Sequence, residues 1–391
     1  MIERNLSSRT RYDTGKRITT GPKGSGLPYE KPAEPSASGP GIERWAIDRA
    51  MPVVGPDLPN RREPHDSPME QSGNDPLACR LEVPVPGGTL HVACAGTPAA
   101  AADRVALAVH GVTGSLMAWR TIARELDERI CLLAPDLRGR GHSRRLPGPY
   151  GLGAHVADLI AVLDHVGAPS AVLVGHSMGA FLALRIAAEY PERALGVVLL
   201  DAGLPFSVPD DTEPFDAQIA NVAARLAITF PSAHHYLQAW QAHPALKKAW
   251  NGDPQAAEDF EAYARYDMVE DGRAVRCTAV AAAVRTDSKE MVTADDVTRT
   301  ALDRVRAPVH LLRAERGLAD LDPLIPADTL QAFRADYPSV RIEEVADVNH
   351  YTLLLGPRRG PQKVAAAIEA FCGAVGCGRN GGKRPDRRRG Q

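Results

Sequence analysis

Ser177 lies in a pattern that could supply a nucleophile. The pattern is G-x-S-x-G, from Gly175 to Gly179, and it stands between the apolar residues 170–174 and a helix expected over residues 178–190. A turn between a strand and a helix holds such a serine on a tight bend, where the glycines avoid Cβ clashes and the hydroxyl projects clear of the sheet. The simpler alternative is that Ser177 only caps the helix. We predict that Ser177 is a nucleophile.

A serine hydroxyl is a poor nucleophile at neutral pH, so this interpretation requires a histidine that accepts its proton and an acid that orients that histidine. Of the twelve histidines, His350 fits best, because it follows the strand expected over residues 340–346 and a parallel sheet would bring it to the edge that carries Ser177. We expect His110 and His176 to shape backbone turns. Three others lie in a helical segment, where a solvated or core role is more common than metal binding: His234, His235 and His243.

Attack on a carbonyl group creates an oxyanion, which needs N–H donors already aimed at it. Residues 110–115 leave a strand as a turn of small residues, which suits the amide of Val112 to this purpose. The amide of Met178, at the positive end of the helix that follows Ser177, is the second predicted donor.

Short apolar runs alternate with amphipathic stretches from Cys79 onward, which is typical of a sheet wrapped by helices. Residues 79–85 and 89–95 predict an antiparallel hairpin around the turn 86–88. Strands that are apolar throughout indicate burial on both faces and hence a mainly parallel sheet. We expect such strands at residues 104–110, 130–136, 170–176 and 195–201, and two further strands at residues 308–314 and 340–346.

The rhythm of strands and helices stops after Asp201 and resumes near residue 301. Residues 204–300 are rich in alanine and helical in pattern, without a convincing strand, which suggests a cap or lid over a site. The core would then be divided into residues 77–203 and 301–376. The segment 1–76 is rich in proline and poor in apolar residues, and the tail 377–391 is basic, so we expect both to be disordered.

Four motifs in this order resemble the alpha/beta-hydrolase superfamily: HGVTGS, PDLRGRGHS, GHSMG and DVNHYT. The resemblance covers about residues 79–375. It implies an α/β fold with a mostly parallel eight-stranded sheet, helices on both faces, and a helical cap inserted after the sixth strand. It also implies Ser177 as nucleophile and His350 as base, with residues 136–143 supporting the site structurally.

The acid of the site is where this sequence departs from the common pattern of the superfamily. Gly317 occupies the position at which similar enzymes often carry an Asp, and the loop after residues 308–314 is lengthened. The other acid position of the superfamily, at the end of the sixth strand, is occupied by Asp201. We therefore favour Asp201 as the acid, with three alternatives left open: Asp320, Asp322 and Glu315.

The resemblance and the serine together predict acyl chemistry without a cofactor or metal. Dehalogenases and epoxide hydrolases of this superfamily need an Asp at the nucleophile position, so a serine argues against them. Ester hydrolysis of a small molecule through an acyl-enzyme is the expected reaction. The alternatives on the same residues are hydrolysis of a thioester, lactone or carbon–carbon bond, and cofactor-free perhydrolysis. A catalytically inactive ligand receptor is the alternative that is not an enzyme.

Composition limits the classes of protein and the cellular locations that fit this chemistry. Lys and Arg number 46 against 48 Asp and Glu, and a net charge of −2 argues against a dedicated nucleic-acid binder. No apolar run approaches the roughly 18 to 20 residues that a membrane span requires, and the first residues lack the apolar region of a secretory signal. We therefore expect a cytoplasmic protein. Six cysteines without CxxC spacing are expected to be reduced.

Overall fold

The structure is a computed structural model that describes residues 75–102, 104–204, 213–293 and 300–374. The basic tail predicted over residues 377–391 lies outside the described residues, as does the predicted leader except for its last two residues.

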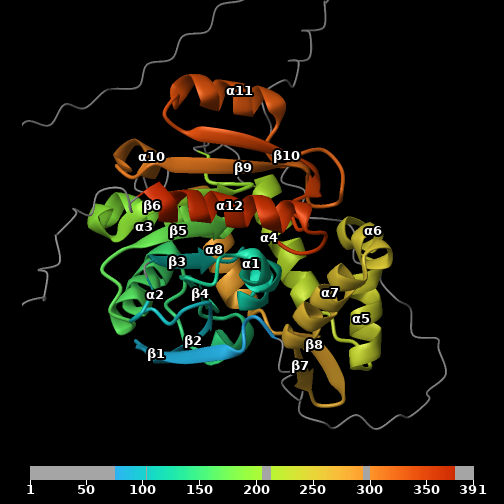
Figure 1. Cartoon of the computed structure of the whole chain (residues 1–391). Coiled ribbons are helices and arrows are strands. Elements are labelled where there is room, and N and C mark those ends of the chain that lie inside the picture. Colours follow the sequence, from blue (N-terminus) through green and yellow to red (C-terminus); the bar gives the residue numbers. More distant parts are fainter. Residues whose placement is uncertain (1–74, 103, 205–212, 294–299, 375–391) are drawn as a thin grey trace, which may run out of the picture. The chain divides into compact units, whose positions relative to one another are not determined.

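One sheet of eight strands forms the centre of the fold, in the order β1-β2-β4-β3-β5-β6-β9-β10 (Figure 1). The first hairpin, β1 with β2, and the pair of β2 with β4 are antiparallel, and every other neighbouring pair is parallel. The predicted mostly parallel eight-stranded sheet is therefore confirmed. Its strands are β1 Cys79–Val85, β2 Gly88–Ala95, β3 Arg104–Val109, β4 Ile130–Pro135, β5 Ala171–His176, β6 Ala194–Leu200, β9 Val309–Arg316 and β10 Arg341–Asn349.

Alternate residues of the central strands point into two separate hydrophobic cores. On β5, for example, Leu173 packs into one core and Val174 into the other. Side chains along a strand alternate between its faces, so runs that are apolar throughout are the ones that need cover on both sides. One core includes residues of α2 Leu152–His165, α3 Met178–Glu189, α10 Ala301–Arg304 and α11 Ala327–Asp336. The other includes residues of η2 Leu116–Trp119, α1 Arg120–Glu125 and α12 Arg359–Ala374.

The predicted helical insertion lies between β6 and β9, and we call it the cap. Its helices α5, α6 and α7 gather beside one end of the sheet together with a short hairpin (Figure 1). Trp250 and Phe260 of the cap are buried in one of the two sheet cores, so this part of the cap is packed onto the core. The elements are α4 Glu213–Leu226, α5 Ala233–Gln241, α6 Pro244–Gly252, α7 Pro254–Tyr266, β7 Met268–Asp271, β8 Ala274–Cys277 and α8 Ala281–Thr293.

The hairpin of β7 and β8 corrects the expectation of an insertion without strands. The two strands are antiparallel and joined by a two-residue turn that starts with Gly272, whose φ of 65° suits a residue without a side chain. Phe230 extends the hairpin, since it exchanges both backbone hydrogen bonds with Val275 at 2.7 and 2.8 Å. The sequence did carry a signal, because glycine is favoured at the first position of one class of two-residue hairpin turn, which is the position of Gly272.

The cysteines require a second correction. Cys79 and Cys94 face each other in the register of β1 and β2 and form a disulfide, although all six cysteines were expected to be reduced. Among the described residues, Cys131, Cys277 and Cys372 carry free thiols. Disulfides are rare in reducing compartments such as the cytoplasm. This bond therefore does not favour the cytoplasmic location, which remains a prediction. No described helix combines the length and apolar composition needed to cross a membrane.

Candidate active site

Ser177 lies directly after β5 on a bend with φ 54° and ψ −120°, a conformation that few residues other than glycine adopt. Its N–H donates a hydrogen bond to the carbonyl oxygen of Leu200 on β6 at 3.1 Å. A Cβ on Gly175 would lie 2.0 Å from the carbonyl oxygen of Gly179, and a Cβ on Gly179 would lie 2.1 Å from that of Val109. The two glycines are therefore required by close backbone contacts. The Ser177 side chain makes no capping hydrogen bond to α3.

His350 and Asp201 meet at the carboxyl edge of the sheet. Asp201 follows β6 with a φ of 53°, and its Oδ2 accepts a hydrogen bond from Nδ1 of His350, just after β10, at 2.8 Å. Its Oδ1 accepts one from the N–H of Ala314 on β9 at 3.0 Å. Both carboxylate oxygens are thus used in fixing this pair. The bond at Nδ1 leaves Nε2 as the imidazole nitrogen that can exchange a proton with a substrate or a hydroxyl.

Both members of this pair are buried, and burial shifts their pKa values in opposite directions. Burial lowers the pKa of His350 below its ordinary value of 6.5, which favours the neutral imidazole. Burial also raises the pKa of Asp201, against the opposing effects of the Ala314 N–H and the charge of Arg313. A neutral imidazole held through Nδ1 is the form that can accept a proton at Nε2.

The three alternative acids have other partners. Asp320 accepts hydrogen bonds from Nε of Arg316 at 2.7 Å and from the side-chain amide of Asn349 at 2.9 Å. Glu315 accepts the N–H of Asp347 at 2.6 Å. The side chain of the third alternative, Asp322, is exposed. Of the four carboxylates considered from the sequence, Asp201 is the one that the structure joins to His350.

The two predicted oxyanion donors belong to backbone segments that adjoin Ser177. Met178 is fully buried and is the first residue of α3. Its N–H is therefore one of the first four of the helix, and these have no hydrogen-bond partner within the helix. Val112 lies in a turn that is closed by a hydrogen bond from the N–H of Gly114 to the carbonyl oxygen of Gly111 at 3.0 Å. We call residues 111–114 the oxyanion turn. A Cβ on Gly111 would lie 3.2 Å from Cβ of Ser177, which places the turn directly beside the serine.

His110 and His176 hold backbone segments around the site. His110 donates from Nδ1 to the carbonyl oxygen of Gly111 at 2.7 Å and accepts the N–H of Leu137 at Nε2 at 3.0 Å. Burial lowers the pKa of His110 to about 3, which keeps this neutral tautomer. His176 donates from Nε2 to the carbonyl oxygen of His350 at 3.0 Å. The expectation that both shape turns agrees with these contacts.

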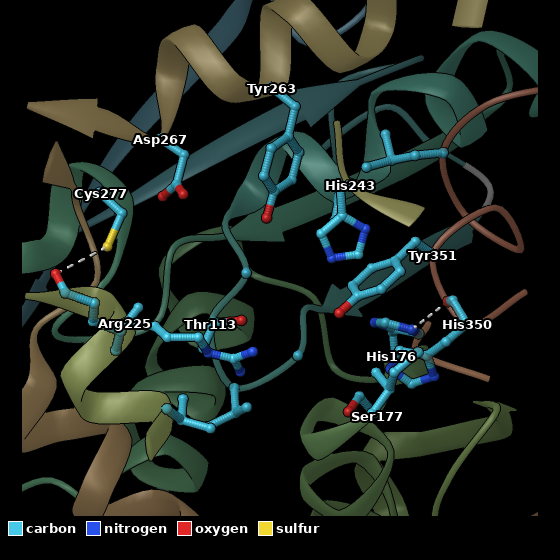
Figure 2. A pocket seen from close by; sticks show the side chains of 18 of the residues that line it. Thr113, His176, Ser177, Arg225, His243, Tyr263, Asp267, Cys277, His350 and Tyr351 are labelled. Atoms are coloured by element: carbon cyan, nitrogen blue, oxygen red, sulfur yellow. Dashed lines mark hydrogen bonds between the residues drawn. The ribbon is translucent and has the colours of Figure 1, made fainter. Parts of the chain in front are cut away.

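A cavity of about 240 Å³ opens beside Ser177 and His350. Figure 2 shows these two side chains at one end of the cavity, with Asp267 and Cys277 toward the other. Many lining residues come from the cap and are apolar or aromatic, among them Val222, Phe230, Tyr236, Trp240, Leu246 and Tyr263. Such a lining suits an apolar group of a small molecule.

Two charged residues of the cavity were not singled out from the sequence. Arg225 of α4 lines it, and so does Asp267, which precedes the cap hairpin. Burial raises the pKa of Asp267 to about 7, although Thr278 and Tyr236 donate hydrogen bonds to its carboxylate. Neither residue stands in a motif, so only the folded cap reveals them.

The histidines of the cap have local roles. His243 also lines the cavity, and its Nδ1 accepts the N–H of Ala245 at the start of α6 at 3.3 Å. Nδ1 of His235 is hydrogen-bonded to the hydroxyl of Ser232 at 2.8 Å, and the ring of His234 lies edge-on to that of His235. Within the described part of the chain, no group of three or more His, Cys, Asp or Glu side chains is arranged to hold a metal ion.

Comparison with known proteins identifies the family. The family described as alpha/beta hydrolase fold matches residues 107–357, which is more than half of the chain. This chain belongs to the alpha/beta hydrolase family. The match includes every residue of the candidate site, from the oxyanion turn to His350.

Curated relatives of this alpha/beta hydrolase are named as different kinds of hydrolase. Lipase LipV of Mycobacterium tuberculosis is 37% identical over 115 residues, which are 29% of this chain and 43% of the lipase. The 2-hydroxy-6-oxo-2,4-heptadienoate hydrolase of Pseudomonas putida is 35% identical over 126 residues, which are 31% of this chain and 43% of that enzyme. The chain thus spans less than half the length of these relatives.

Solved structures agree with the fold. E-2-(Acetamidomethylene)succinate hydrolase superimposes with a TM-score of 0.58 and 24% identity, over 75% of this chain and 98% of that one. A thermophilic esterase from Thermogutta terrifontis gives a TM-score of 0.56 and 23% identity, over 76% of this chain and 99% of that one. At these identities the likeness concerns the fold alone.

Proposed function

We propose that this alpha/beta hydrolase cleaves a carboxylic ester, with Ser177 as nucleophile, His350 as general base and Asp201 as the acid that orients it. The observation that carries the proposal is the 2.8 Å hydrogen bond between His350 and Asp201. His350 lines the same pocket as Ser177, which lies on a bend with positive φ. Val112 and Met178 supply the oxyanion donors in this proposal. Nucleophile, base and orienting acid are the three groups that serine hydrolysis requires.

The first half of the reaction forms an acyl-enzyme. Oγ of Ser177 attacks the ester carbonyl carbon while its proton passes to Nε2 of His350. The carbonyl oxygen becomes an oxyanion, which accepts hydrogen bonds from the amides of Val112 and Met178. The tetrahedral intermediate then collapses, the bond to the alkoxy group breaks, and the alcohol leaves with the proton from Nε2.

The second half releases the acid. Nε2 of His350 removes a proton from water as the water oxygen attacks the acyl carbonyl. A second tetrahedral intermediate forms on the same two amides, and its collapse breaks the bond to Oγ of Ser177, which regains the proton from His350. Asp201 stabilises the imidazolium formed in each half by accepting the hydrogen bond from Nδ1.

The pocket supports an ester with a small apolar group, because aromatic and aliphatic side chains of the cap form much of its lining. Carbon–carbon bond hydrolysis is the second candidate. It is favoured by the similarity to the heptadienoate hydrolase of Pseudomonas putida, whose name describes a carboxylate with a keto group. Arg225 in the pocket would suit the carboxylate of such a compound.

A substrate series with an inactive control tests the proposal. Purified protein and its Ser177→Ala variant are compared on p-nitrophenyl esters of two to twelve acyl carbons, on thioesters and lactones, and on a vinylogous 1,5-diketo carboxylate. We expect turnover of short esters by the wild-type protein and a loss of at least 10³-fold in the variant. Turnover of the diketo acid alone would favour the second candidate. No Ser177-dependent turnover of any compound would support a ligand receptor instead.

A further inference from the structure

Asp287 joins the cap to the core from within a buried cluster. It lies on α8 and is fully buried, as are the side chains of its partners Arg140 and His155. Its Oδ2 forms an ion pair with Nη1 of Arg140 and accepts a hydrogen bond from Nε2 of His155 at 2.9 Å. Its Oδ1 accepts the N–H of Gly151 at 2.7 Å. Asp287 therefore provides the negative charge beside a buried guanidinium of the core.

The same guanidinium holds the oxyanion turn. Nε and Nη2 of Arg140 both donate to the carbonyl oxygen of Val112, at 3.0 and 2.8 Å, and Nη1 donates to that of Arg138 at 3.0 Å. The planar guanidinium has its donors in a fixed geometry, so a partner at Nη1 also sets the direction of Nε and Nη2. Asp287 thus orients the group that fixes the backbone next to the proposed oxyanion donor.

Close packing leaves α8 little freedom relative to this loop. The N–H of Val280, just before α8, donates to the carbonyl oxygen of Gly139 at 2.9 Å. A Cβ on Gly139 would lie only 2.6 Å from Cβ of Ala283, so α8 approaches the backbone directly. A displacement of α8 would therefore be transmitted to Arg140.

A second buried carboxylate of the cap offers a matched comparison. Asp259 of α7 is also fully buried and pairs with Arg120. It accepts two hydrogen bonds from Arg124, both at 2.9 Å, and one from the hydroxyl of Thr121 at 2.8 Å. All three of these partners belong to α1, whereas the partners of Asp287 include the residue that binds the oxyanion turn.

We propose that Asp287 is a positioning residue of the active site, which aligns the amide of Val112 through Arg140 and so couples docking of the cap to formation of the oxyanion site. This inference rests on the proposed function, because it assumes an oxyanion at Val112. Without Asp287 the buried guanidinium loses its counter-charge and turns toward other acceptors. The transition state then loses an aligned donor, while binding of the substrate in the pocket stays the same.

The test compares Asp287→Asn with Asp259→Asn on a short p-nitrophenyl ester. For Asp287→Asn we expect kcat to fall about 10- to 100-fold with KM within about threefold, because one oxyanion donor contributes about 10²–10³ in kcat when removed. Its affinity for phenylboronic acid, which forms a tetrahedral anion on the serine, should fall by a similar factor. For Asp259→Asn we expect a lower melting temperature but a kcat within about threefold of the wild-type value.

Arg140→Lys covers the case in which Asp287→Asn fails to fold. Lysine keeps the positive charge beside Asp287 but lacks the planar fork that holds Val112, so we expect the same selective loss of kcat. Wild-type kcat in a folded Asp287→Asn or Arg140→Lys protein would overturn the inference, as would equal losses in the Asp287 and Asp259 variants. If the wild-type protein neither cleaves the ester nor binds the boronic acid, the proposed function itself fails.

Discussion

Positive φ values alone do not mark the residues of the candidate site. Ser177 and Asp201 have φ near 50°. Asp320 and Asp347 have similar φ values of 59° and 63°, but their carboxylates accept hydrogen bonds from residues other than His350. The difference lies in what surrounds each residue. Ser177 and Asp201 follow neighbouring parallel strands, so their strain is held in place by the sheet and directs both side chains to one edge. A positive φ therefore indicates a candidate site residue only when that residue also follows a central strand of the sheet.

The acid can be assigned by comparing two variants. Asp201→Asn removes the charge that supports the imidazolium and favours the wrong tautomer of His350, so kcat on a short ester should fall about 10²- to 10⁴-fold. Asp320→Asn should change kcat by less than about threefold, because its partners are Arg316 and Asn349. Steady-state kinetics of both variants check this prediction. A larger loss in Asp320→Asn than in Asp201→Asn would contradict the assignment.

The pH profile tests the state of His350. Burial lowers the pKa of this imidazole below 6.5, and the base must be unprotonated to accept the proton from Ser177. Activity should therefore be retained as the pH falls to 6.5 and decline only at more acidic pH, as the base becomes protonated. We expect kcat/KM, measured from pH 4 to 9, to have an acidic midpoint below 6.5. A midpoint above 7 would show that the attraction of Asp201 outweighs burial.

At the scale of elements, the sequence predicts the strands best, because they recur along the chain as apolar runs. Each strand of the large sheet was expected within a few residues of its observed bounds, and the signal is strongest for the central strands, which are apolar throughout because both of their faces are buried. The short hairpin of β7 and β8 was missed, because four-residue strands with charged residues in a helical segment carry a weak signal. Only Gly272, at the first position of the turn, indicated it.

The tight turn between β5 and α3 can be tested with one glycine and a control. Gly179→Ala would bring a Cβ to 2.1 Å from the carbonyl oxygen of Val109, so either α3 or β3 must move. We expect a loss of about 2 kcal/mol in the free energy of unfolding, together with lower activity. Gly252→Ala is the control, because nothing lies within 4 Å of its Cβ at the end of α6. Equal stability of the two variants in urea denaturation would contradict this packing.

At the scale of the whole molecule, the features that the sequence leaves open or misses are pairings that depend on the folded chain. His350 and Asp201 are separated by 149 positions, and the lengthened loop after β9 left three other acids open until the fold joined this pair. The disulfide depends on the register of β1 with β2, and the pair of Asp287 with Arg140 depends on how the cap docks. No local pattern encodes which of 48 acidic residues meets which base. Motifs predicted the candidate nucleophile and base, and tertiary packing selects their partners.

The claim that Ser177 is the nucleophile of an ester hydrolase is tested most directly by covalent labelling. A fluorophosphonate reacts with a serine hydroxyl that has been activated by a neighbouring base and places phosphorus where the tetrahedral carbon would be. Intact-mass measurement and peptide mapping after labelling should give one adduct per chain, on the peptide that contains Ser177, and none in Ser177→Ala or in denatured protein. An unlabelled folded protein, or an adduct that persists in Ser177→Ala, would contradict the account.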